Sequence, residues 1–214
     1  MVAIDRPDRE VPREKTHTGE IVLLGTTGSC LLAFVSLWVA DGSWQLAAEL
    51  ASRFSLMLFV IAMMVEPVAR LIPVSTVRAL GRERGGFMLA FCLSAAVSLA
   101  CLAAPYLLNA EPLSAPAIAY CALTSFILAV TLLSGHPATI RFLGGPAWRA
   151  MQRVSTAYFW IAFTLIGVDH VVGPHRPNSW YGLSLLLLVA AVLVRFADAL
   201  VAHLRRSPPP SRTV

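Results

Sequence analysis

The chain has 214 residues, of which 57% are hydrophobic and 14% are charged, and its formal net charge is +5. Soluble domains contain about a quarter of charged residues, so this composition excludes a soluble enzyme or binding module and predicts an integral membrane protein. A membrane-spanning helix needs roughly 20 mostly apolar residues, and six such stretches can be placed along the chain. We therefore expect an all-α, polytopic membrane protein built as a bundle of six transmembrane helices.

The predicted spans cover residues 21–40, 48–72, 86–108, 115–134, 148–172 and 179–203. They divide the chain into a flexible cytoplasmic tail (1–20), a transmembrane domain (21–203) and a disordered, basic and proline-rich tail (204–214). The first tail interleaves acidic and basic residues and cannot bury enough apolar surface to fold alone. The first apolar run is longer than the roughly 7–15 residues of a signal peptide, so we expect it to be retained as a span.

Small residues are prominent in the first span, where residues 25–29 read GTTGS. Small residues let helices approach closely inside a membrane, where packing must drive association, so we expect this patch to contact another helix.

The four cysteines all fall inside predicted spans and lack CxxC spacing. We therefore expect buried, apolar cysteines rather than disulfides or a zinc site; they are Cys30, Cys92, Cys101 and Cys121.

The second span carries two acid–base pairs at helical i, i+4 spacing. Glu49 and Arg53 are expected to pair near the outer membrane interface. Glu66 and Arg70 flank Pro67, which can kink or end the helix. Glu66 is therefore either a partner of Arg70 at the inner interface or an intramembrane functional carboxylate.

In the last span, Arg195 and Asp198 lie at i, i+3 and are expected to neutralise each other. Buried charges of this kind leave a small transporter open as a function. Glu66, Arg53 and Arg195 would then be the functional charges. No internal repeat or pair of broken helices points to an inverted-repeat transporter.

Basic residues are distributed unequally between the two sides of the predicted membrane domain. One side collects fourteen, whereas the other has Arg176 and, near its edge, Arg53. By the positive-inside rule we expect both termini in the cytoplasm and a location in the bacterial inner membrane. The fourteen are Arg6, Arg9, Arg13, Lys15, Arg70, Arg78, Arg82, Arg84, Arg141, Arg149, Arg153, Arg205, Arg206 and Arg212. No aromatic-interleaved basic surface or binding motif predicts a nucleic-acid partner.

Three stretches of the chain resemble a known membrane family. They read ASRFSLMLFVIAMMVEPVARLI, RALGRERGGFMLAF and LLSGHPATIRFLGGPAWRAMQRVSTAYFWIAF. Their landmarks include Ser52-Arg53, Glu66-Pro67, the basic turn at 84–87, Leu143-Gly144 and Trp148. In order and spacing they resemble the ferric-reductase-like transmembrane domain, nearest the MsrQ (YedZ) type of heme-binding membrane subunit.

The resemblance implies a six-helix frame that holds heme b between two imidazoles, but the matched positions here lack imidazoles. The ligand on the third span corresponds to Ala96 or its neighbours Ala95 and Val97, and those on the fifth correspond to Gln152 and Leu165. We therefore expect a heme-free membrane subunit or scaffold without catalytic, cofactor-binding or metal-binding residues. Its expected partners are the lipid bilayer, a protein in the membrane or periplasm, and a lipid or quinone.

The alternative is a b-type-cytochrome-like electron-transfer subunit with shifted heme ligands. His136 and His170 are the candidate ligands, because both lie within reach of the bundle. No strand-bounded GxGxxG motif predicts a bound dinucleotide, and the tails are too short for a βαβ unit. Even in this reading the chain is not expected to be an enzyme on its own, since its reductant would come from another protein or from quinone.

Overall fold

The computed structural model describes residues 18–39, 43–72, 74–109, 114–134, 137–172 and 179–206. Within these ranges the chain is helical and has no strand. The helices are α1 (Thr18–Val39), α2 (Trp44–Leu71), α3 (Ser75–Arg82), α4 (Arg84–Asn109), α5 (Ala115–Ser134), α6 (Pro137–Val172) and α7 (Ser179–Arg206). Six of the described helices, all except α3, are long and apolar enough to cross a membrane. The prediction of an all-α, six-helix membrane domain is confirmed.

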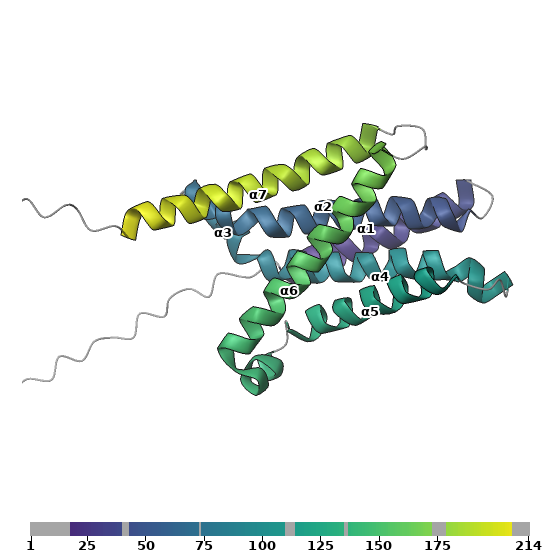
Figure 1. Cartoon of the computed structure of the whole chain (residues 1–214), viewed down its shortest axis with the longest axis horizontal. Coiled ribbons are helices and arrows are strands. Elements are labelled where there is room, and N and C mark those ends of the chain that lie inside the picture. The colour runs from purple at the N-terminus through teal and green to yellow at the C-terminus, as the bar shows by residue number, and fades with distance from the viewer. Residues whose placement is uncertain are drawn as a thin grey trace, which may run out of the picture.

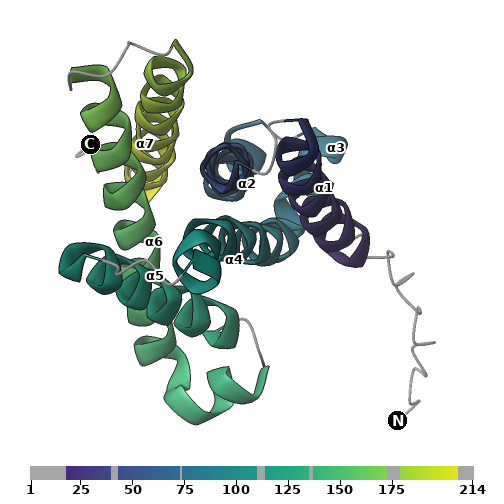
Figure 2. The same ribbon diagram turned by 90° about the vertical axis from the view of Figure 1, so that its right-hand side faces the viewer.

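The long helices form a bundle with a compact group of three on one side (Figures 1 and 2). Helices α1, α2 and α4 pack closely against one another in this group. On the other side α7 packs on α2, and α5 packs on α4. Helix α6 crosses the bundle obliquely, so it contacts both α5 and α7 (Figure 1). Side chains of α2, α4, α5, α6 and α7 line a pocket between these helices.

Small residues bring the three helices of the compact group together. A Cβ atom at Gly25 would lie 2.6 Å from the Cβ of Ala90, so α1 and α4 touch at their backbones. Three buried serine hydroxyls also meet between the helices: Ser94 of α4 pairs with Ser29 of α1 and, at 2.8 Å, with Ser55 of α2. Such contacts hold helices together where the hydrophobic effect cannot. The expected contact of the 25–29 patch is confirmed.

Aromatic rings connect α6 to the compact group. Phe91 of α4 lies 5.1 Å from Phe59 of α2 and 4.8 Å from Phe159 of α6, measured between ring centroids. Phe163, one turn along α6, lies 5.7 Å from Phe59. Tilted and edge-to-face pairs at these separations are favourable geometries for aromatic rings. The cluster therefore fixes where α6 crosses α2 and α4.

The ends of the long helices agree with the ends of the predicted spans to within a few residues, except at α6. This helix begins at Pro137, well before the predicted start at 148, and is broken at Gly144, where φ is 73° and ψ is 159°. The predicted fifth span corresponds to the part that follows this break. The short helix α3 lies between the second and third predicted spans, outside both, and has no buried residue.

At the ends of the bundle, α1 begins inside the tail predicted for 1–20 and α7 ends inside the tail predicted for 204–214. The rest of both predicted tails lies outside the described residues.

The cysteines are all free thiols; Cys92 and Cys101 are buried as expected, Cys121 is half-buried and Cys30 is exposed. The prediction of four buried cysteines is therefore wrong for Cys30, which is exposed on α1.

Candidate functional site

A cavity of about 370 Å³ lies between α2, α4, α5, α6 and α7. We call it the Arg53 cavity, after the arginine at its polar end. Its inner wall is apolar and includes Leu56, Phe91, Leu99, Phe159 and Phe163. Small-molecule sites typically occupy about 300–1,000 Å³ and combine apolar walls with a few placed polar groups. The Arg53 cavity has this character.

The polar end of the cavity is a cluster of five interacting side chains, Glu49, Arg53, His170, Trp180 and Tyr181, which we call the mouth cluster. Arg53 Nη2 donates to Glu49 Oε1, and the Tyr181 hydroxyl donates to the same oxygen at 3.0 Å. The Arg53 guanidinium lies 5.7 Å from the Trp180 ring centroid and 5.6 Å from that of Tyr181. The ring of His170 stacks on Tyr181 at 4.0 Å. The expected Glu49–Arg53 pair is confirmed.

Arg53 has donor capacity that the described part of the chain does not use. A guanidinium offers five N–H groups and no acceptor. The Nε of Arg53 is buried and has no hydrogen-bond partner among the described residues. A buried donor without a partner costs roughly 1–3 kcal/mol. Trp160 Nε1 is also unpaired among the described residues but does not line the cavity, so Arg53 is the lining residue that carries an orphaned donor.

Trp180 and Tyr181 are the site residues that sequence reasoning missed. Both come from the beginning of α7, whereas Glu49 and Arg53 come from α2. The only signal was the pair of adjacent aromatic residues at a predicted span end, a pattern typical of any membrane interface. Their contact with Arg53 depends on the packing of α7 on α2, which residue spacing does not encode.

The candidate heme ligand His170 lines the Arg53 cavity, and its Nδ1 lies 2.9 Å from the backbone oxygen of Ile166. The α4 residues that line the same cavity include Ala95, Ser98 and Leu102, none of which has an imidazole or thioether. The other candidate, His136, lies outside the described residues. Among the described residues, no group of three or more His, Cys, Asp or Glu could hold a metal ion.

The positions matched to family heme ligands do not converge. Ala96 is exposed on α4, and Leu165 is exposed on α6 with 64% of its surface accessible. Gln152 lines a separate cavity of about 290 Å³ near the beginning of α6. There its Nε2 donates to Ser134 Oγ at 3.3 Å, and Trp148 Nε1 donates to the Ser134 backbone oxygen at 2.7 Å. Gln152 thus helps to tie α6 to α5.

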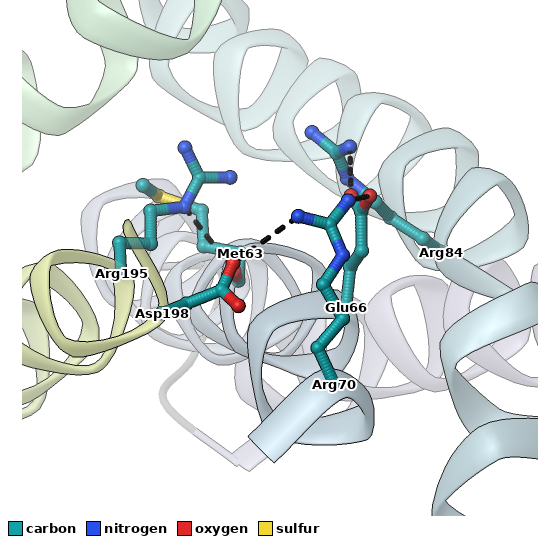
Figure 3. A network of polar contacts seen from close by, with 6 residues as sticks. All are labelled: Met63, Glu66, Arg70, Arg84, Arg195 and Asp198. Atoms are coloured by element: carbon teal, nitrogen blue, oxygen red, sulfur yellow. Dashed lines mark hydrogen bonds and ion pairs between the residues drawn. The ribbon is translucent and has the colours of Figure 1, made fainter. Parts of the chain in front are cut away.

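At the other end of the bundle, Glu66 is the centre of a charged network (Figure 3). Its carboxylate accepts from Arg70 on the same helix and from Arg84 of α4. Arg70 Nη1 also donates to Asp198 Oδ2 of α7 at 3.2 Å. The expected Glu66–Arg70 pair is confirmed, and the network joins α2 to α4 and α7.

Arg195 does not pair with Asp198, so the prediction that they neutralise each other is wrong. Its Nε donates instead to the backbone oxygen of Met63 at 3.3 Å (Figure 3). Asp198 faces α2, where it reaches Arg70. The physical reason is helix packing: the contact between α7 and α2 offers each side chain a partner across the interface, and these contacts replace the i, i+3 pair.

Comparison of the chain with models of known protein families, with curated proteins and with solved structures finds no match. The resemblance to the ferric-reductase-like transmembrane domain therefore stays a prediction from sequence motifs.

Proposed function

We propose that the chain is a heme-free subunit or scaffold of the bacterial inner membrane with a ferric-reductase-like frame, and that its functional site is the Arg53 cavity. The cavity would hold a small organic molecule, such as a quinone or a single lipid, without covalent attachment. The observation that carries the proposal is a cavity with an apolar, aromatic inner wall and one arginine with an orphaned donor.

The side chains around the cavity support an organic ligand over a heme. A b-type heme that only transfers electrons is usually held by two axial ligands. His170 could supply one, but the α4 residues of the lining include Ala95 and Ser98 rather than a second histidine or a methionine. His170 is also engaged by Tyr181 and by the Ile166 carbonyl.

Absorbance spectroscopy tests the heme-free assignment. Protein purified from cells supplied with a heme precursor should show no Soret band in oxidised or dithionite-reduced form. Mass spectrometry of an organic extract of the same sample should reveal a co-purifying lipid or quinone. A stoichiometric, reducible Soret band with a low-spin, bis-ligated spectrum would overturn the proposal.

The position of His170 in the cavity lining is the observation that favours the alternative, an electron-transfer subunit with shifted heme ligands. If that alternative holds, His170→Ala abolishes heme absorbance, and His136→Ala does so only if His136 is the second ligand. A Soret band that both variants retain in full would exclude these two ligands.

A further inference from the structure

We propose that the Arg53 cavity selects an uncharged amphiphile whose head carries a carbonyl oxygen, with Arg53 as the donor to that oxygen. This inference rests on the proposed function, because it assumes that the cavity holds a small organic molecule. It adds the chemical class of the ligand and the residue that recognises its head.

The charge balance of the mouth cluster favours an uncharged head. Glu49 is the acidic residue of the cavity lining, Arg53 is its basic residue apart from His170, and the two already neutralise each other. Moving an isolated charge from water into a low-dielectric site is costly unless an opposite charge compensates it. A carboxylate or ammonium head would find no net charge to compensate it.

The hydrogen-bond balance of the lining favours an acceptor on the ligand. Two serine hydroxyls of the lining are already used, since Ser98 Oγ donates to the Ala48 carbonyl at 2.9 Å and Ser184 Oγ donates to the Trp180 carbonyl at 2.8 Å. The Nε–H of Arg53 is satisfied by no acceptor among the described residues. A carbonyl oxygen can accept such a bond, and hydrogen bonds to a charged donor are among the stronger ones.

The apolar wall fits the remainder of the ligand. Phe91, Phe159 and Phe163 present rings from α4 and α6, and Leu56 and Leu99 complete the wall. A ring or a single apolar chain would bury its surface there while its carbonyl stays beside Arg53. Two sources share this chemistry, an isoprenoid benzoquinone with ring carbonyls and a monoacylglycerol with an ester carbonyl.

Equilibrium binding to the full-length protein in detergent tests the inference. The probes are a short-chain benzoquinone, monoolein and oleate, the last as an anionic counterpart of monoolein, titrated separately at neutral pH. At least one uncharged probe should bind about tenfold more tightly than oleate. The uncharged probe that binds more tightly identifies the source. Equal or tighter binding of oleate would overturn the inference.

Two variants locate the site and its donor. Ala95→Leu fills the cavity wall and should weaken binding of the uncharged probe about tenfold, whereas Ala96→Leu, on the exposed neighbouring residue, should leave it unchanged. Arg53→Lys keeps the positive charge beside Glu49 but removes the guanidinium, and should weaken binding about fivefold. Unchanged binding in Ala95→Leu or in Arg53→Lys would overturn the inference.

The absorbance spectrum of the same samples distinguishes a failure of the proposed function from a failure of the carbonyl inference. A Soret band would refute the proposed function. Heme-free protein that binds none of the probes would refute the carbonyl inference and leave the subunit assignment standing. The thermal unfolding midpoint of each variant, measured without probe, should match that of the wild type, so that lost binding reports the cavity and not the fold.

Discussion

Gly144 breaks α6 with a backbone conformation that other residues rarely adopt. Its φ of 73° and ψ of 159° fall in a region open essentially to glycine alone. No neighbouring heavy atom lies within 4 Å of a Cβ built at this position. Any cost of a side chain here is therefore backbone strain and not crowding.

We predict that Gly144→Ala destabilises the protein by about 1–3 kcal/mol. Gly145→Ala is the matched control, because a Cβ there also meets nothing within 4 Å and its φ is not positive. The stability of each variant is measured by unfolding it with sodium dodecyl sulfate while circular dichroism monitors the loss of helix. Equal stability of the two variants would show that the break at Gly144 does not require glycine.

Ser94 connects three helices through its hydroxyl, which pairs with Ser29 and Ser55. Ser94→Ala leaves Ser29 without this partner, whereas Ser55 keeps its bond to the Ala51 carbonyl at 2.8 Å. Interhelical hydrogen bonds in membranes contribute on average about 0.6 kcal/mol, so we expect a loss of about 1 kcal/mol. The same unfolding assay on Ser125→Ala, an exposed serine of α5, should show no loss.

Which residues could be predicted from sequence depended on whether their partners were local. Glu49–Arg53 and Glu66–Arg70 were predicted because a helical turn brings i and i+4 together whatever the tertiary structure. The same reasoning failed for Arg195 and Asp198, which have better partners across the α2–α7 interface. Tyr181 reaches Glu49 across the same interface.

At the scale of elements, α1 is positioned by close contact with α4. A Cβ on Gly25 would lie 2.6 Å from that of Ala90, and both belong to rigid helical backbone. Gly25→Ala should therefore force the two helices apart and cost about 1–3 kcal/mol, the usual range for overpacking. Gly182→Ala on α7, where a Cβ meets nothing within 4 Å, should be neutral in the same unfolding assay. A neutral Gly25→Ala would mean that α1 shifts without loss.

The helices that could be predicted well from the sequence are those that contain a long, continuous stretch of apolar residues. All six spans were found because each helix must satisfy its own backbone hydrogen bonds in the membrane and needs a long apolar run. Helix α3 and the first part of α6 carry polar and basic residues and give no such signal. The cavity was not predictable either, because it depends on the oblique crossing of α6 (Figure 1).

For the whole molecule, the arginines gather at one end of the bundle. Helix α3, the beginning of α6 and the end of α7 lie toward the same end (Figure 1), and they contain Arg78, Arg82, Arg141, Arg149 and Arg205. The Arg53 cavity lies toward the opposite end, where Arg53 is the one arginine among the described residues. If the positive-inside rule holds, the cavity belongs to the periplasmic half of the membrane.

We predict this orientation from the arginines and propose to measure it with reporter fusions. Alkaline phosphatase, which is active only outside the cytoplasm, should be active when fused after residue 42, 112 or 176 and inactive after 73, 136 or 214. A cytoplasmic fluorescent protein should give the reverse pattern at the same points. The inverted pattern would place the cavity in the cytoplasmic half. A failure to alternate would contradict six spans, because each span must carry the chain to the other side.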